Sequence, residues 1–171
     1  MSSSPMPTAA RECGDCQACC EGWLTATILD QELGPGTGCR HRCAQGCGIY
    51  ASRPDNPCRV FRCGWLRGDA NLPADLRPDL SGVIVISDRP WQGWLVLRLI
   101  PTGEQIPDRA LETLQALARQ ERMPLIIQRN AKRSDGSYER LKDVGYGPPA
   151  FAQAVKQAIK PEDVTMAQIT D

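Results

Sequence analysis

The sequence has a single histidine, His41, and aromatic residues make up only 5% of its 171 residues. With one histidine and no pair of carboxylates at a meaningful spacing, it offers no candidates for a catalytic triad or for ordinary acid–base hydrolysis. The P-loop, G-x-G-x-x-G, H-E-x-x-H and G-x-S-x-G motifs are also missing. If the protein is an enzyme, a bound metal has to supply its chemistry.

The chain also has no excess charge and no long hydrophobic run. Its 20 basic and 20 acidic side chains cancel, so nucleic acid and anionic membranes are not expected partners. Apolar runs such as residues 83–86 are far too short to cross a bilayer. The N-terminus has neither the basic segment nor the apolar segment of a secretory signal, which predicts a cytoplasmic protein. Structural disulfides are rare in that compartment.

The most informative feature is the placement of the cysteines. All nine lie between Cys13 and Cys63, and four of them form the run C-x2-C-x2-C-C from Cys13 to Cys20. Clustering of this kind is typical of metal ligands, of a disulfide framework or of a redox relay. The odd number of thiols and the reducing compartment both favour metal.

The spacing of Cys13, Cys16 and Cys19 is that of bacterial ferredoxins, in which three such thiolates and a remote fourth hold a [4Fe–4S] cluster. Four thiolates can equally hold zinc in a closed tetrahedral site. Cys20 either reaches a second metal or packs without ligating, because neighbouring residues rarely point both side chains at one ion. Six arginines and one acid, Asp55, lie between Cys39 and Arg67, and this excess would offset the charge of an anionic thiolate site.

The order of motifs resembles a known family. After C-x2-C-x2-C-C come Gly-Cys-Gly-Ile-Tyr at 46–50, Arg53-Pro54 and C-R-x-F-x-C at 58–63. This pattern resembles the YkgJ-like CxxCxxCC cysteine-cluster family, described as a zinc- or iron-chelating domain, over about residues 13 to 63. A flagellin lysine N-methylase shares the motif, which suggests an iron–sulfur cluster in some relatives. Cys43 has no counterpart in the pattern. The ligand set that the resemblance implies is Cys13, Cys16, Cys19, Cys20, Cys39, Cys47, Cys58 and Cys63.

The predicted fold class is α+β, with an irregular metal-organised cysteine-cluster module followed by a small α+β unit. We expect a flexible arm at 1–12, the metal-binding module at 13–65, the α+β unit at 66–160 and a polar tail at 161–171. The module is expected to consist of loops and short helical turns held together by ligation. Glycines at 46 and 48 argue against a helix through Cys39, Cys43 and Cys47, although their spacing would place them on one helical face.

In the second half, hydrophobic periodicity predicts the order β-β-α-β-(β)-α. Strands are expected at 83–87, 94–100 and 125–129, with a short one around Tyr138. Helices are expected at 108–122, with Asp108 as the N-cap, and from Pro148 onward. The second helix would present Phe151, Val155, Ala158 and Ile159 on one face. Residues 69–78 are predicted to be a polar connector, and residues 23–29 to be either a strand or a helical turn.

The leading functional hypothesis is a cytoplasmic protein that binds an iron–sulfur cluster, of the [4Fe–4S] type, or zinc, with a protein partner docking on the α+β half. Two alternatives are an Fe–S-dependent enzyme of electron or methyl transfer, and a thiol redox sensor that uses Cys19–Cys20 or Cys43. His41 is expected in an exposed loop. Tyr50 and Phe61 are expected to fill a small core beside the metal.

Overall fold

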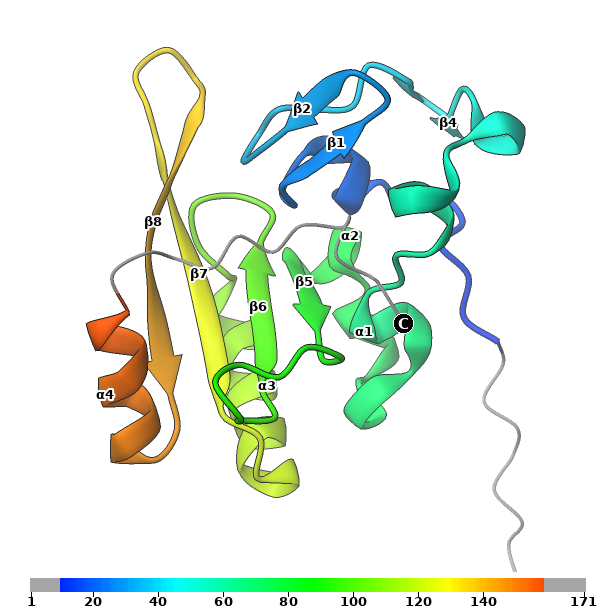
Figure 1. The fold of residues 1–171 in the computed structure, drawn as a ribbon. Helices are drawn as coiled ribbons and strands as arrows, with labels where there is room; N and C mark the ends of the chain where they lie inside the picture. The colour runs from blue at the N-terminus through cyan, green and yellow to red at the C-terminus, as the bar shows by residue number, and fades with distance from the viewer. Residues whose placement is uncertain (1–9, 159–171) are drawn as a thin grey trace, which may run out of the picture.

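A four-stranded sheet lies at the centre of the computed structural model, which describes residues 10–158 (Figure 1). Neighbouring strands follow one another along the chain, in the order β5-β6-β7-β8. The first and last pairs are antiparallel, whereas β6 and β7 are parallel. The strands are β5 (Val83–Ile86), β6 (Leu97–Pro101), β7 (Leu125–Lys132) and β8 (Tyr138–Tyr146).

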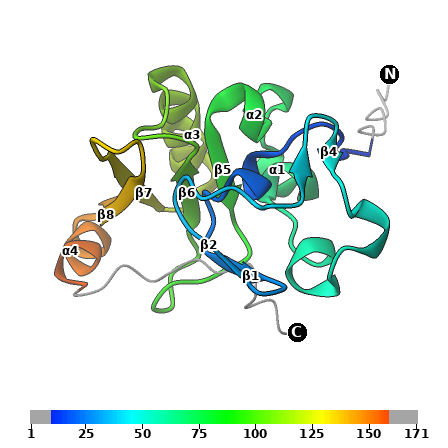
Figure 2. The same cartoon turned by 90° about the horizontal axis from the view of Figure 1, so that it is seen from above.

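Two helices cover the sheet. The parallel pair β6–β7 needs a crossover connection, and α3 (Asp108–Glu121) supplies it. Figures 1 and 2 show α3 on one face of the sheet and α4 (Pro149–Gln157) on the other, beside β8. Successive side chains of β7 point to opposite faces of the sheet. Leu125 joins the cluster that contains Leu114 of α3, and the next residue, Ile126, packs with Phe151 of α4. None of the helices between residues 10 and 158 has the length and apolar character that crossing a bilayer requires.

The cysteine-rich half contains only short elements, as the sequence predicts for loops and helical turns. It lies along the β5 edge of the sheet (Figure 1), where α1 packs against that strand. In chain order these elements are η1 (Ala18–Glu21), β1 (Ala26–Ile28), β2 (Gln31–Leu33), β3 (Arg42–Cys43), β4 (Gly46–Cys47), η2 (Tyr50–Ser52), η3 (Asp55–Arg59) and α1 (Gly64–Arg67), followed by η4 (Asp69–Asn71), η5 (Ala74–Leu76) and α2 (Pro78–Ser81).

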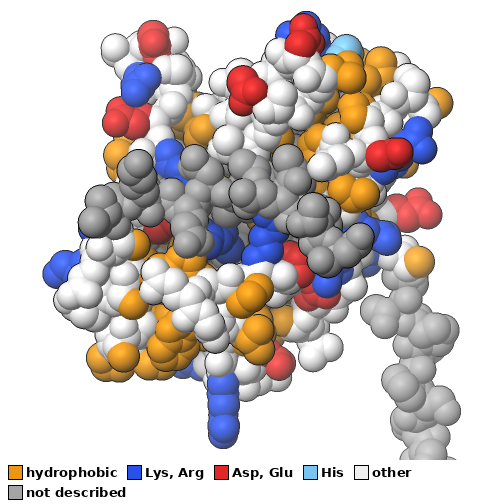
Figure 3. Space-filling view, in the orientation of Figure 1, with side chains coloured by type: hydrophobic (Ala, Val, Ile, Leu, Met, Phe, Trp, Pro, Cys, Tyr) orange, Lys and Arg blue, Asp and Glu red, His pale blue; other side chains and the backbone are white. Residues whose placement is uncertain are grey.

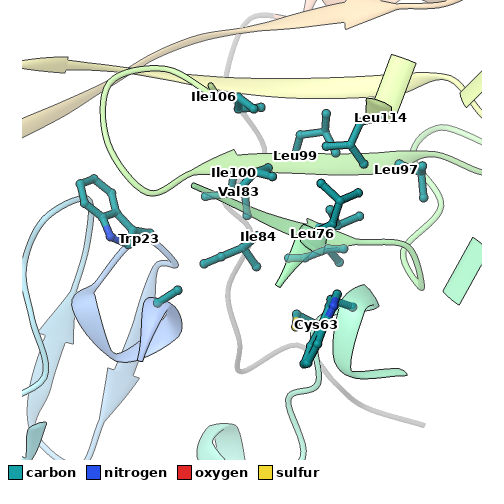
Figure 4. Packing of buried hydrophobic residues seen from close by; sticks show 14 of the residues in the cluster. Trp23, Cys63, Leu76, Val83, Ile84, Leu97, Leu99, Ile100, Ile106 and Leu114 are labelled. Carbon is teal, nitrogen blue, oxygen red and sulfur yellow. The ribbon is translucent and has the colours of Figure 1, made fainter. Parts of the chain in front are cut away.

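One hydrophobic cluster runs through both halves of the chain. Trp23 and Leu24 from the cysteine-rich half belong to the same set of buried side chains as Ile84 and Leu99 of the sheet. Figure 4 shows Cys63 and Trp23 approaching this cluster from the side of the cysteine-rich half. Packing therefore continues across the boundary predicted at residues 65/66. That the two parts of the chain unfold independently stays a prediction.

The α+β class is confirmed, as is the order of elements in the second half. The strand bounds differ from expectation: β5 ends one residue earlier, at Ile86, and β7 continues three residues further, to Lys132. β6 begins at Leu97, because Trp91 and Trp94 bond to each other across a turn, with N···O distances of 2.9 and 2.8 Å. β8 has nine residues where a short strand around Tyr138 is expected. It is an edge strand with many partly exposed polar side chains, so it lacks the apolar run by which sequence analysis recognises a buried strand.

Two further expectations need correction. Asp108 is the first residue of α3, and Pro107 occupies the N-cap position. The segment 69–78 is more than a polar connector, because Leu72 and Leu76 are only 1% and 3% exposed. Their spacing of four residues places both in the core between short helical turns. The predicted tail at 161–171, the Ile159 position and residues 1–9 of the arm lie outside the described residues.

Arg11, within the predicted flexible arm, is fixed to the body of the protein. Its guanidinium donates hydrogen bonds to the carbonyls of Trp65 and Leu72, with N···O distances of 2.8 and 2.6 Å, and lies 5.1 Å from the Trp65 ring centre. Charged hydrogen bonds of this kind contribute about 1.5–3 kcal/mol. We therefore expect Arg11→Ala to lower the free energy of unfolding by about 2 kcal/mol in chemical denaturation.

The matched control is Arg133→Ala, which removes an exposed arginine that pairs with the similarly exposed Glu139. Exposed ion pairs contribute little, so its free energy of unfolding should change by less than about 0.5 kcal/mol. An equal effect of both substitutions would show that the Arg11 contacts do not stabilise the fold.

Candidate metal centre

The C-x2-C-x2-C-C run folds into a tight turn followed by one turn of 3₁₀ helix. The Cys16 N–H donates to the carbonyl of Cys13 at 2.9 Å, and η1 then carries both Cys19 and Cys20. A 3₁₀ helix has three residues per turn, so consecutive side chains point about 120° apart. Cys19 and Cys20 therefore face different surroundings.

Four thiols form a first group, made of Cys13, Cys16, Cys19 and Cys63. Burial raises the pKa of Cys19 well above its ordinary value, and the thiolate charges of Cys63, Cys13, Cys20 and Cys16 raise it further. Burial also raises the pKa of Cys63, to which Cys13 and Cys16 contribute, and that of Cys13, to which Cys16 contributes. Each pair within this group is thus close enough for one charge to act on the other.

A second group consists of Cys20, Cys39, Cys47 and Cys58. Burial raises the pKa of Cys20 to about 11, with the thiolates of Cys39, Cys47 and Cys58 as the next causes and Cys13 after them. Burial likewise raises the pKa of Cys58, and the charges of Cys39 and Cys47 raise it further. Cys20 also raises the pKa of Cys19, so the two groups adjoin at η1.

Backbone hydrogen bonds bring the second group together. The Cys39 N–H donates to the Cys20 carbonyl at 2.8 Å, which places two of its members side by side. The hairpin β3–β4 then returns the chain, with Arg42 opposite Cys47, and the Gly48 N–H donates to the His41 carbonyl at 2.8 Å. The hairpin confirms that no helix runs through this segment.

Both groups reach the core, because half-buried Cys16 and Cys19 of the first and Cys39 and Cys58 of the second pack against the main hydrophobic cluster, whereas Cys13 is exposed. Cys63 is 6% exposed and precedes α1 as its N-cap residue, and the backbone N–H groups of Trp65 and Leu66 at the start of that helix partly offset the rise in its pKa. Figure 3 shows apolar side chains gathered on the surface over the region of β1, β2 and β4. Among the large apolar side chains exposed in this half are Leu29 and Tyr50.

The thiols are near one another but are not arranged as a closed coordination site. All nine cysteines are free thiols. In the part of the chain that the structure describes, no three His, Cys, Asp or Glu side chains have the geometry that holds a metal ion. The two groups are therefore defined by which thiols raise the pKa of one another, and not by a coordination geometry. Four thiolates per group is nevertheless the donor set of a structural zinc site and of a [4Fe–4S] cluster.

Arginines accompany both groups, as expected from the composition of this segment. Arg53, Arg62 and Arg77 act on Cys13 and lower its pKa against the rise caused by burial. Arg53 has the same effect on Cys58 in the second group. Positive charge beside the sulfurs would stabilise them as thiolates.

Arg77 also fixes the loop that carries the first group. Its guanidinium pairs with Asp15 and with Asp79, the latter at 2.8 Å. A hydrogen bond from Arg77 holds the pKa of Asp15 below its ordinary value. Asp15 lies between Cys13 and Cys16, so this ion pair ties the C-x2-C turn to the start of α2.

Cys43 stands apart from both groups. It is exposed and pairs with Gly46 in the β3–β4 hairpin, and it is not among the thiols whose charges raise the pKa values described above. Instead it lines a shallow surface hollow with Asp15, Glu21 and Arg42. His41 lies in the turn that precedes β3 and is half-buried, although sequence analysis places it in an exposed loop.

Tyr50 does not have the role expected from the sequence, which was to fill a small core beside the metal. It is 64% exposed and fills no core. The guanidinium of Arg53 stacks on its ring at 3.6 Å from the ring centre, an arrangement favoured by the attraction between a cation and an aromatic face. Phe61 is half-buried and packs against the main core.

Sequence analysis identifies these eight cysteines as candidate ligands but does not divide them. Of the later thiols, Cys63 is the one that raises the pKa of Cys19 most, and nothing in the spacing distinguishes it from Cys39 or Cys58. Only the packing of α1 against β5 places Cys63 beside Cys19. No family model, no curated protein and no solved structure matches this chain, so the resemblance to the CxxCxxCC family remains a hypothesis.

Proposed function

We propose that this protein binds metal through the eight thiols of the two groups, as an iron–sulfur protein of the [4Fe–4S] type in preference to a zinc protein, in the cytoplasm. The observation that carries the proposal is the gathering of eight of the nine cysteines, spread over fifty residues of sequence, into two sets of four. Thiols that merely filled a core would have no reason to assemble in fours.

The surroundings of the sulfurs support the same proposal. Four thiolates on Zn²⁺ leave a charge of about −2, and an iron–sulfur cluster is similarly anionic. Arg53 and Arg62 lie close enough to Cys13 to lower its pKa and would offset that charge. When bound, zinc would supply structural cross-links, and an iron–sulfur cluster would add the capacity to accept and donate an electron.

The chain's own residues would position the ligands and limit the access of water. The core side of the first group is closed by buried Cys63, whose pKa is lowered by the nearby peptide N–H groups of Leu66 and Trp65 against the rise caused by burial. Electron or methyl transfer remains the alternative enzymatic role, and a thiol redox sensor the third. A protein partner remains part of the proposal. The proposal includes neither nucleic acid nor a membrane as a partner.

The test is the metal content of protein purified without oxygen. We expect metal bound through cysteine sulfur. Iron together with acid-labile sulfide and visible absorbance would identify a cluster, whereas colourless protein with zinc would identify a structural site. Folded protein without either metal would contradict the proposal.

A matched pair of variants checks that the thiols are the ligands. Cys16→Ser removes a member of the first group and should lower the bound metal by about half or more, because a site that loses one ligand loses its folding contribution. Cys43→Ser should leave metal content unchanged. Equal losses from both substitutions would show that Cys43 is also a ligand.

A further inference from the structure

Three charged side chains meet on the face of the sheet that α4 covers. Arg98 of β6 is paired with Ile126 of β7, and Ile126 packs with Phe151 of α4, so Arg98 points to the α4 side. Its guanidinium lies 3.7 Å from a carboxylate oxygen of Asp143 on β8, and that of Arg140 lies 3.1 Å from the same oxygen. Figure 3, which views this face, shows basic side chains at its centre.

A β-bulge brings Arg140 and Asp143 to the same face. Residues three apart in a regular strand point to opposite faces of the sheet. The register of β7 and β8 shifts between Ile127 and Arg129, and there three steps along β8 match two steps along β7. The extra residue lets Arg140 and Asp143 pair on one side of the sheet. Bulges re-aim side chains in this way next to functional sites.

The cluster is buried and carries excess positive charge. The side chains of Arg98, Asp143 and Arg140 are 6%, 9% and 12% exposed. Two guanidiniums share one carboxylate, so the three side chains together have a net charge of +1. Burial of excess charge is costly, and the face therefore favours a covering segment that brings acidic groups. The described elements that pack there, α4 and the Trp91–Trp94 turn, have no acid in their sequences.

We propose that residues 159–171 dock on this face of the sheet, with the carboxylates of Glu162 and Asp163 on the two arginines. These are the first two acids that follow α4 in the sequence. Arginine binds carboxylates through charge-assisted hydrogen bonds, which are stronger and more specific than neutral ones. The two negative charges would offset the excess positive charge of the cluster. This docking involves only the α+β half and does not depend on a bound metal.

The end of α4 is close enough to the cluster for the acids to reach it. The ammonium group of Lys142, in the same stretch of β8, donates a hydrogen bond to the carbonyl of Lys156 in α4. Glu162 follows Gln157, the last residue of α4, by five positions, and an extended chain of that length spans about 17 Å. Neighbouring strands are ~4.8 Å apart, so β6 lies about 10 Å from β8. Both arginines are therefore within reach.

The test is photo-cross-linking within the full-length protein. The photoreactive residue p-benzoylphenylalanine, in place of Val164, would bond on irradiation to whatever lies beside the two acids. We expect cross-links within one chain to β6, β7 or β8, identified by mass spectrometry of the digested protein. Cross-links only to other parts of the chain, or none at all, would overturn the proposal. Cross-links between two chains would also overturn it, because the face would then receive this segment from a second copy.

Charge variants separate docking from mere proximity. Glu162→Gln/Asp163→Asn should lower the yield of cross-links to the sheet about fivefold or more, because neutral amides form weaker hydrogen bonds with arginine. Arg140→Gln should have a similar effect, and the first variant decides the outcome should Arg140→Gln not fold. The control Asp135→Asn/Glu139→Gln makes the same two chemical changes in exposed residues at the β7–β8 turn and should leave the yield unchanged. Equal yields from Glu162→Gln/Asp163→Asn and this control would overturn the docking of the acids on the arginines.

Discussion

Removal of the metal is expected to abolish amide-exchange protection in residues 34–62 while the sheet β5–β8 keeps its protection. In that stretch Pro57 is the only buried residue, and its regular structure amounts to the two-residue strands β3 and β4 and the short turns η2 and η3. By contrast, all four residues of β5 and all five of β6 are buried. The two regions thus depend on different sources of stability.

The sizes of the free-energy contributions support this difference between residues 34–62 and the sheet. Ordering the backbone costs ~1–2 kcal/mol per residue, so the whole stretch requires tens of kcal/mol from its contacts. Burial of one proline side chain contributes ~1–2 kcal/mol at most. A structural zinc site contributes ~10–16 kcal/mol in small zinc-binding peptides. Metal is therefore the larger of these two contributions by far, and its loss should release the stretch as a unit.

The β1–β2 hairpin provides an internal control in the same experiment. It also lies in the predicted metal-binding module, but Leu24, Ala26, Ile28 and Leu33 are each at most 3% exposed within the common core. We expect its amides to keep intermediate protection after chelation. Loss of protection throughout 13–65 would support the division predicted from the sequence. Simultaneous loss across the sheet would show a single cooperative unit with the metal at its centre.

A single methyl group at Gly22 is expected to disrupt the second group of thiols. Gly22 ends η1 with φ of 84°, a left-handed conformation that residues with a Cβ adopt at a cost of ~1–2 kcal/mol. A Cβ at this position would also lie 1.9 Å from the carbonyl oxygen of Thr37 and 2.8 Å from that of Gly34. Both are backbone atoms, so the loop they belong to would have to move.

Movement of that loop would separate the ligands. Thr37 is two residues before Cys39, whose N–H bonds to the Cys20 carbonyl at 2.8 Å. We expect Gly22→Ala to lower the free energy of unfolding by about 4 kcal/mol or more, in the range of severe single substitutions. It should also lose the metal of the second group while any soluble protein retains that of the first. Thermal unfolding and metal analysis measure the two effects.

Gly136 is the matched control for this substitution. Its φ of 85° is nearly the same as that of Gly22, but nothing lies within 4 Å of the position its Cβ would take. Gly136→Ala therefore carries the backbone strain alone, and we expect a loss of ~1–2 kcal/mol without change in metal content. If the two variants are equally stable and hold equal metal, the contact with Thr37 does not constrain the loop.

The sequence by itself determined the class of the fold and the candidate ligands. Periodicity was sufficient for β5, α3 and α4, because each has one face or more in a hydrophobic core and its apolar residues recur accordingly. It was insufficient for β8, an edge strand whose side chains are mostly partly exposed. The cysteine spacing singled out Cys13, Cys16 and Cys19, since short spacings within one loop constrain where sulfurs can point. The set of eight candidate ligands without Cys43 came from the resemblance to the CxxCxxCC family.

Only the tertiary structure decided how those thiols are divided. Cys19 and Cys20 are neighbours in sequence, yet the three-residue period of η1 turns them toward different groups. Cys63 joins Cys19 because α1 packs so closely on β5 that a Cβ at Gly64 would lie 3.2 Å from the Val85 carbonyl oxygen. Such contacts join residues far apart in the chain. They depend on the packing of whole elements, which local spacing does not encode.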